Sequence, residues 1–245
     1  MSDPGERADE LSRNLAALRE RIGKACAAAG REPSSVSLLA VTKTVPAADV
    51  ATLVDLGLDA FGENRAHEAA AKVDDVAALR PGAHPRWHFV GGLQRNKVKL
   101  VVPWVHRIES VDSPRLARAL DRAVAGARED GTRDGPLPVL LQYSVDGDPS
   151  RGGVPGDGLP RLADLVAELP GLALAGLMAV APLDTDTDRA FAAIAAAAER
   201  LRDGHPGATE LSAGMSGDLE TAVGHGSTVV RVGTALLGDR PLASE

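Results

Sequence analysis

The chain has 245 residues, a formal net charge of −7 at pH 7 and one cysteine. This length suffices for one domain without disulfides, and the negative charge gives no electrostatic reason to bind nucleic acid or anionic lipid. The polar N-terminus is unlike a secretory signal, and the longest apolar run, residues 171–183, is too short to span a bilayer. We therefore expect a cytoplasmic protein.

Apolar residues at helical spacing predict a first helix over residues 9–29, with Cys26 as a buried apolar side chain. Strands and helices then alternate eight times. Strands are expected at 36–41, 58–61, 86–90, 105–108, 137–144, 172–178, 210–212 and 227–232. Helices are expected at 47–56, 64–79, 93–101, from the N-cap Ser113 onward, at 159–168, 186–202, 218–223, and in a turn near Ala235.

Alternating strands and helices form a parallel sheet, and eight couplets predict a closed α/β barrel of the (β/α)8 type with an extra N-terminal helix. The alternative is an open, doubly wound sheet. Two stretches rich in glycine and aspartate, 128–135 and 146–158, lie within couplets and are expected to be surface loops. Residues 1–245 are therefore expected to form a single domain.

Lys43 follows the first predicted strand, and barrels gather their chemistry at the C-terminal ends of strands. We expect its amine at the barrel mouth, where desolvation favours the neutral form that can make an imine. The alternative is a strand-end lysine that merely reaches solvent. The other four lysines, Lys24, Lys72, Lys97 and Lys99, lie in helical segments with solvated faces expected.

The loops after the seventh and eighth strands are rich in glycine and hydroxyl side chains. Residues 212–218 read Ser-Ala-Gly-Met-Ser-Gly-Asp and residues 231–234 read Arg-Val-Gly-Thr, each leading into a helix. Backbone N–H groups at such places, with the Ser216 hydroxyl, can converge on an anion, and barrels usually hold a phosphate here. A phosphate-bearing aldehyde needs this cradle and a nearby amine together.

Other strand ends offer further candidates. Asn64 is expected either to bond a ring substituent or to N-cap the next helix. His88 is expected either to line the cofactor pocket or to be a core histidine. No histidine and cysteine group has metal-ligand spacing and no phosphate-loop motif occurs, so no metal is predicted.

Six segments together resemble the pyridoxal phosphate homeostasis protein family: residues 40–44, 61–65, 87–97, 176–179, 211–216 and 226–234. The resemblance covers nearly the whole chain in order. It implies a barrel similar to the N-terminal domain of alanine racemase, with pyridoxal 5′-phosphate (PLP) as a Schiff base on Lys43. It also implies that Met215, Ser216, Gly233 and Thr234 hold the phosphate and that Arg231 faces the pyridine nitrogen. Ser212 is a further expected cofactor contact, beside Asn64 and His88.

Two functions follow from this site. The first is a PLP-binding protein of vitamin B6 homeostasis that releases the cofactor by transimination, without robust catalysis. An arginine at the pyridine nitrogen disfavours its protonation and makes the ring a poorer electron sink. The alternative is a low-activity PLP-dependent amino-acid racemase; in racemases of this fold the second base is a tyrosine from another domain, and the only tyrosine here is Tyr143.

The expected partners are small molecules. They are PLP together with small amines or amino acids, and transient contact with PLP-dependent apoenzymes is a further candidate. No nucleic acid and no membrane are expected. The predicted helices show no unusually large apolar face, so a monomer is the default.

Overall fold

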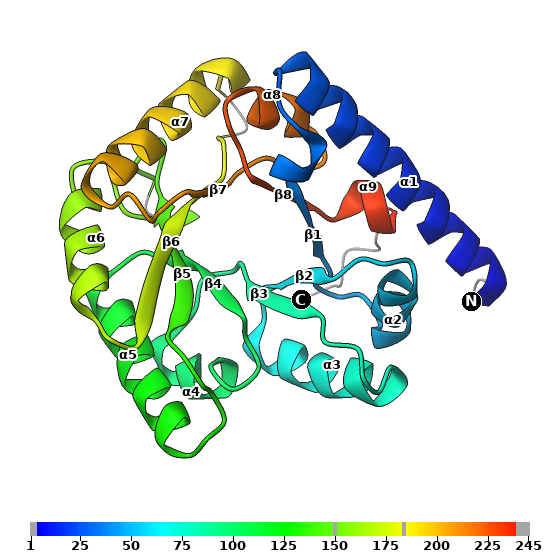
Figure 1. Cartoon of the computed structure of the whole chain (residues 1–245), viewed down its shortest axis with the longest axis horizontal. Coiled ribbons are helices and arrows are strands. Elements are labelled where there is room, and N and C mark those ends of the chain that lie inside the picture. The colour runs from blue at the N-terminus through cyan, green and yellow to red at the C-terminus, as the bar shows by residue number, and fades with distance from the viewer. Residues whose placement is uncertain (1–3, 149–150, 183–184, 239–245) are drawn as a thin grey trace.

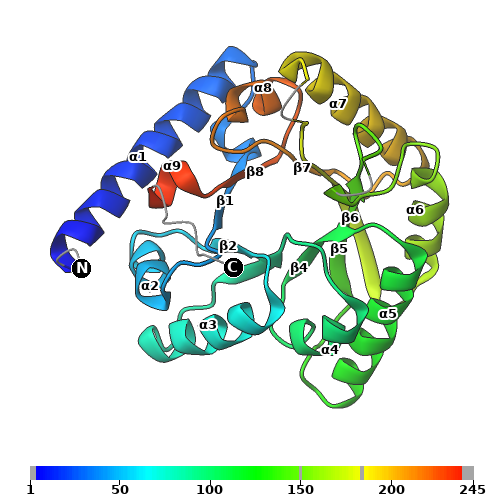
Figure 2. The same ribbon diagram turned by 180° about the vertical axis from the view of Figure 1, so that it is seen from behind.

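The computed structural model describes residues 4–148, 151–182 and 185–238. Its eight strands close into a barrel in chain order, and all neighbouring strands run parallel (Figures 1 and 2). The strands are β1 (Ser37–Val41), β2 (Ala60–Glu63), β3 (Arg86–Phe89), β4 (Arg107–Val111), β5 (Leu137–Tyr143), β6 (Leu172–Ala179), β7 (Glu210–Ser212) and β8 (Val229–Val232). The predicted (β/α)8 barrel is confirmed, and the open sheet is wrong.

Helices surround the strands (Figure 1). They are α1 (Pro4–Ala28), α2 (Ala47–Asp55), α3 (Ala66–Leu79), α4 (Val98–Val101), α5 (Pro114–Glu129), α6 (Leu159–Glu168), α7 (Thr187–Gly204), α8 (Leu219–Gly224) and α9 (Thr234–Leu237), with 3-10 turns η1 (Pro33–Ser35) and η2 (Arg95–Lys97). The helix predicted over 93–101 is therefore η2 followed by the single turn α4.

Three strands, β2, β4 and β8, begin two residues later than predicted, and for β2 and β4 the physical reason is the same. The predictions started these two at Leu58 and Val105, both of which are buried apolar residues. The Leu58 N–H donates to the Leu53 carbonyl at 3.0 Å and the Val105 N–H donates to the Val101 carbonyl at 3.1 Å. Each residue thus closes the preceding helix, and its apolar side chain mimics the start of a strand.

The extra N-terminal helix is confirmed as α1. It packs against α2, α8 and α9 on the side of the barrel where β1 meets β8 (Figures 1 and 2). Its apolar stripe is buried, and the free cysteine Cys26 in that stripe is 0% exposed, as predicted. α1 therefore covers the helices that follow the seventh and eighth strands.

The described part of the chain buries several charged side chains. Glu63, Lys72, His88, Glu109 and Arg231 are each at most 6% exposed. A charged side chain is tolerated in a protein interior when it is paired and hydrogen-bonded. These five residues therefore need polar partners within the fold. Among residues 4–148, 151–182 and 185–238, no helix combines the length and the apolar character that a membrane crossing requires.

Candidate functional site

Lys43 lies in the turn directly after β1, at the C-terminal face of the barrel. Thr44, the next residue, has φ 63°, a left-handed conformation that strains a β-branched residue. The turn is held by the Val45 N–H, which donates to the Thr42 carbonyl at 3.0 Å, and by the Thr44 N–H, which donates to Glu68 Oε1 at 2.8 Å. The position of Lys43 agrees with the sequence, but its side chain is exposed, so the expected desolvation is wrong.

Lys72 is the buried lysine of this region, which corrects the expectation of a solvated face. It is 6% exposed, and its Nζ lies 2.7 Å from Glu63 Oε1 and 2.7 Å from the Thr42 carbonyl. The Thr42 hydroxyl donates to the same Glu63 oxygen at 2.7 Å. Lys72 shares a helical spacing with Ala69 and Val76, the other buried residues of α3. That spacing was the signal that could have placed it on the inner face.

The loops after β7 and β8 come together, as the phosphate prediction requires. The Ala235 N–H donates to Ser216 Oγ at 3.3 Å, and the Arg231 N–H donates to the Gly214 carbonyl at 2.9 Å. Gly214 has φ 91°, and a Cβ there would lie 2.4 Å from the Ala222 Cβ. Glycine is therefore required for this loop to lie against α8.

The predicted phosphate residues line this junction in different ways. Met215 and Ser216 are half-buried in the β7 loop, and the Met215 N–H donates to Asp218 Oδ1 at 2.5 Å. Gly233 is half-buried and Thr234 is exposed at the start of α9. The structure thus groups these four residues, with backbone donors and hydroxyl groups at one place.

Arg231 and Ser212 belong to a chain of hydrogen bonds that crosses the barrel interior. Arg231 Nη1 donates to Ser212 Oγ at 2.8 Å, and Ser212 Oγ donates to Glu109 Oε2 at 2.6 Å. Glu109 Oε1 lies 2.7 Å from His88 Nδ1. Arg231 Nη2 also donates to the Ala179 carbonyl at 2.7 Å. His88, Glu109, Ser212 and Arg231 lie on β3, β4, β7 and β8, on different sides of the barrel. Hydrogen bonds among their side chains therefore cross the barrel interior.

The charge states of the groups in this hydrogen-bond network follow from their surroundings. Burial raises the pKa of Glu109, but His88, Arg231 and Ser212 together outweigh burial and hold that pKa below its usual range. Burial lowers the pKa of Arg231, although the charge of Glu109 opposes this shift. An ionised carboxylate only accepts hydrogen bonds, so Nδ1 of His88 carries the proton. His88 is thus bonded within the barrel, and its contact with a cofactor stays a prediction.

Glu109 was missed by the sequence analysis because the fourth strand was ended at Ile108. Ile108 pairs with Val139 and Val111 pairs with Leu141, so β4 has one more residue than β5 between these pairs. Such a bulge redirects side chains and often lies near a functional site. A glutamate and a serine directly after an apolar strand residue were the available signal.

Asn64 follows β2 but does not cap α3, because Arg65 occupies the N-cap position. The capping alternative is therefore wrong. Asn64 Oδ1 is buried and has no hydrogen-bond partner within the described ranges. Gly91 packs on this residue, since a Cβ at Gly91 would lie 2.6 Å from the Asn64 Cβ. An unpartnered buried acceptor is costly, which favours the alternative that Asn64 contacts a ligand.

Helix α1 bonds directly to the grouped loops, a connection that the sequence did not reveal. Arg21 Nη2 donates to the Ser216 carbonyl at 3.1 Å. Asn14 Nδ2 donates to the Leu236 carbonyl at 3.0 Å, and Arg7 Nη2 donates to the Leu237 carbonyl at 3.0 Å. The extra helix thus fixes both parts of the candidate phosphate site.

Comparisons with known proteins agree with this geometry. The family model described as alanine racemase, N-terminal domain, matches residues 13–241. The pyridoxal phosphate homeostasis protein of Mycobacterium tuberculosis is 48% identical over 249 residues, covering 98% of this chain and 96% of that protein. The protein of the same name from Escherichia coli is 37% identical over 235 residues, covering 95% and 97%.

Solved structures give the same result. PipY of Synechococcus elongatus, with PLP bound, has a TM-score of 0.76 and 34% identity, covering 93% of this chain and 100% of that chain. Alanine racemase of Corynebacterium glutamicum has a TM-score of 0.69 at 19% identity, covering 97% of this chain and 62% of that chain, which shows the shared fold alone. The chain is a member of the pyridoxal phosphate homeostasis protein family and has the barrel of the alanine racemase N-terminal domain.

Proposed function

We propose that this chain binds PLP as a Schiff base on Lys43 and serves PLP homeostasis by releasing the cofactor to an incoming amine. The observation that supports this most is the position of Lys43 beside the grouped loops. β1 pairs with β8 from Ser37↔Val229 to Ala40↔Val232, so the turn after β1 and the start of α9 are neighbours on one face. The amine of Lys43 and the loops proposed to hold the phosphate therefore come from neighbouring strand ends. PLP is present in the PipY structure, a relative of 34% identity.

The residues at this face fit the chemical parts of PLP. The Ser216 hydroxyl, the Thr234 hydroxyl and the N–H groups at Met215 and Gly233 suit a phosphate. Asp218 has to give up its bond to Met215 for that N–H to reach a phosphate oxygen. Arg231, fixed by Ser212 and Ala179, suits the pyridine nitrogen.

Bound PLP supplies an aldehyde carbon that forms an imine with a neutral amine. Lys43 supplies that amine and is exposed, so an incoming amine has access to the same place. Accessibility suits a protein that releases its cofactor. Localisation in the cytoplasm and the absence of robust turnover belong to the same proposal.

An absorption spectrum before and after borohydride reduction, with mapping of the modified peptide, tests the proposal. The expected result is an imine band and a reduced adduct on Lys43. Lys43→Ala should abolish the band and unfold like the wild-type chain freed of PLP, because an exposed strand-end side chain adds little to the core. Lys24→Ala is the matched control and should keep the band. An adduct on another lysine, or a collapse of stability in Lys43→Ala, would contradict the assignment.

The racemase alternative is tested separately. Purified protein is incubated with single L-amino acids, and the D-isomer is followed. Robust turnover that disappears in Lys43→Ala would replace the carrier proposal with an enzyme. A colourless protein with no imine band would instead indicate a barrel for another phosphorylated metabolite.

A further inference from the structure

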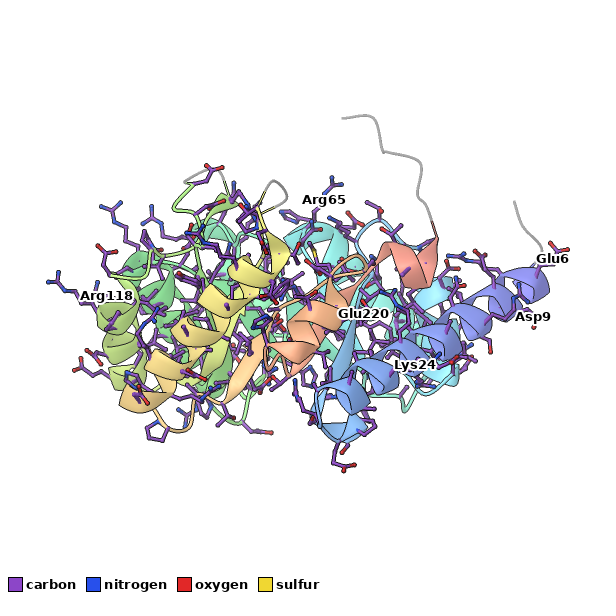
Figure 3. All side chains as sticks on the ribbon, turned by 90° about the horizontal axis from the view of Figure 1, so that it is seen from above. Glu6, Asp9, Lys24, Arg65, Arg118 and Glu220 are labelled. Atoms are coloured by element: carbon purple, nitrogen blue, oxygen red, sulfur yellow. The ribbon has the colours of Figure 1, made fainter. Side chains whose placement is uncertain are left out.

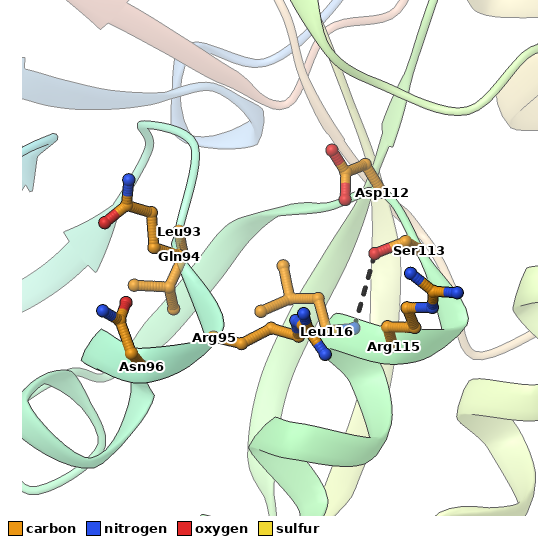
Figure 4. A pocket seen from close by; sticks show the side chains of 8 residues that line it. All are labelled: Leu93, Gln94, Arg95, Asn96, Asp112, Ser113, Arg115 and Leu116. Carbon is orange, nitrogen blue, oxygen red and sulfur yellow. Dashed lines mark hydrogen bonds between the residues drawn. The ribbon is translucent and has the colours of Figure 1, made fainter.

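A polar cavity opens on the same face as Lys43. It has a volume of about 570 Å³ and is lined by Leu93, Gln94, Arg95, Asn96, Asp112, Ser113, Arg115 and Leu116. These residues follow β3 and β4, just as Lys43 follows β1. Figure 4 shows the loop and η2 on one side and the start of α5 on the other. The cavity is therefore part of the C-terminal face and separate from the grouped loops after β7 and β8.

The polar side chains of this cavity are not used by the fold. Arg95, Arg115 and Asp112 make no ion pair or side-chain hydrogen bond within the part of the chain that the structure describes, and the same holds for the amides Gln94 and Asn96. Ser113 alone is engaged, since its Oγ accepts from the Leu116 N–H at 3.4 Å (Figure 4). Two cations, two amides and one carboxylate thus line one open cavity without partners among the described residues; Asp112 is half-buried and the other four side chains are exposed to solvent.

The floor of the cavity is apolar and firmly packed. Leu93 is 7% exposed and Leu116 is 3% exposed, and both belong to the main hydrophobic cluster. A fixed apolar floor with polar groups around it is the usual composition of a small-molecule site. The excess of cations selects for a carboxylate, because guanidinium groups bind carboxylates with paired hydrogen bonds. Asp112 supplies the complementary charge for an ammonium group.

We propose that this cavity binds a free α-amino acid, with its carboxylate on Arg95 and Arg115, its ammonium on Asp112 and its side chain over Leu93 and Leu116. This inference rests on the proposed function in one respect: it names amino acids as the amines presented to the cofactor face. The cavity then distinguishes an amino acid from amines without a carboxylate and from carboxylates without an ammonium.

The test is a ¹⁵N NMR titration of the full chain carrying Lys43→Ala and freed of PLP, so that neither the protein nor the added amine forms an imine. The probes are L-alanine, ethylamine (no carboxylate) and N-acetyl-L-alanine (no ammonium). L-alanine should shift the amide signals of residues 93–96 and 112–116 in a saturable way, N-acetyl-L-alanine should bind more weakly, and ethylamine should not bind. If Lys43→Ala does not fold, the wild-type chain freed of PLP takes its place.

Single substitutions test which charged side chain binds each end of the amino acid. Arg95→Leu and Arg115→Leu should each weaken L-alanine binding by about tenfold or more, as expected for loss of a charge-assisted hydrogen bond. Asp112→Asn should weaken L-alanine and leave N-acetyl-L-alanine unchanged. Arg118→Leu is the matched control: Arg118 is exposed on the same helix, outside the cavity lining, and should have no effect (Figure 3).

Several results would overturn the proposal. They are equal binding of ethylamine, an equal loss in Arg118→Leu, or shifts confined to another part of the chain. Equal binding of N-acetyl-L-alanine would reassign the cavity to a peptide terminus and overturn it too. A wild-type imine without L-alanine binding rejects this inference alone, whereas L-alanine binding without an imine rejects the proposed function alone.

Discussion

Two fully buried carboxylates, Glu63 and Glu109, lie on opposite sides of the barrel wall. Glu63 points outward to α3, and its Oε1 takes both the Thr42 hydroxyl and the Lys72 ammonium, while its Oε2 has no partner within the described residues. Glu109 points inward and uses both oxygens, one on His88 and one on Ser212.

The two arrangements distribute charge differently. The outer cluster balances its carboxylate with Lys72, whose Nζ is 2.7 Å away. The inner cluster spreads one carboxylate over side chains from β3, β7 and β8, including a histidine and an arginine. Removal of the single close cation from a buried carboxylate should therefore cost much of the free energy of unfolding at once. Removal of one member of a distributed network should cost less, because the other members keep some of their hydrogen bonds.

Lys72→Met should have the largest effect. The substitution leaves the Glu63 carboxylate buried without its close cation, which costs about 3–5 kcal/mol in the free energy of unfolding. Urea denaturation measures the loss. The matched control is Lys24→Met, since the Lys24 side chain is 76% exposed in a surface pair and should change little. Adding Glu63→Gln should restore much of the loss, and failure to do so would show that the methionine itself disturbs α3.

Glu109→Gln should cost less, about 2–3 kcal/mol, because Arg231 keeps its bonds to Ser212 and to the Ala179 carbonyl. Glutamine preserves the shape but offers one acceptor where two donors need one each. Urea denaturation of the variant at pH 7 gives the value. A loss equal to that of Lys72→Met would remove the distinction between a concentrated and a distributed charge.

The stability difference between the wild type and Glu109→Gln should depend on pH. The pKa of Glu109 is lowered in the fold, so its ionised form contributes stability above the unfolded pKa, near 4.3, and this contribution disappears as pH falls. The stability difference between wild type and Glu109→Gln should therefore be largest near pH 7 and shrink below about pH 4. A difference that grows on acidification would mean that the carboxylate is not the stabilising species.

Local patterns made the barrel predictable, and long-range contacts limited the prediction of its charged interior. The spacing of apolar residues identifies each strand and each helix, and turn residues mark where each one ends. The eight strand–helix couplets could therefore be predicted in order from local sequence. Burial of Glu109 depends on Ser212, 103 residues away in sequence, and the position of Arg231 depends on Ala179, 52 residues away. No local pattern reports such partners.

The same distinction between local patterns and long-range contacts applies to the residues of the candidate site. Lys43 and the glycine-rich loops were found because turn chemistry after a strand is local. The exposure of Lys43 and the burial of Lys72 were reversed. Lys72 is buried because α3 places it against Glu63 of β2 and the Thr42 carbonyl after β1. The helical spacing of Lys72 with Ala69 and Val76 shows that part of this information was local after all.

Ser216→Ala and Thr234→Ala test the grouped loops after β7 and β8, which lie outside the inner cluster. Each removes a hydroxyl proposed to bond a phosphate, and each should weaken PLP retention by about 1–2 kcal/mol. Equilibrium dialysis followed by the imine absorbance measures retention. Thr52→Ala, at an exposed hydroxyl on α2, is the control and should retain PLP like the wild type. Unchanged retention in both test variants would remove the phosphate assignment.

Arg21→Leu should have the smallest effect. Its partners are the Glu220 carboxylate, 51% exposed, and the Ser216 carbonyl, and surface pairs of this kind contribute below about 1 kcal/mol to stability. Glu220→Gln removes the same ion pair but keeps the bond to Ser216. If α1 fixes the phosphate loop through that carbonyl, PLP retention should fall in Arg21→Leu and not in Glu220→Gln. Equal retention in the two variants would limit α1 to a packing role, because the bond from Arg21 to the Ser216 carbonyl is what separates them within the described residues.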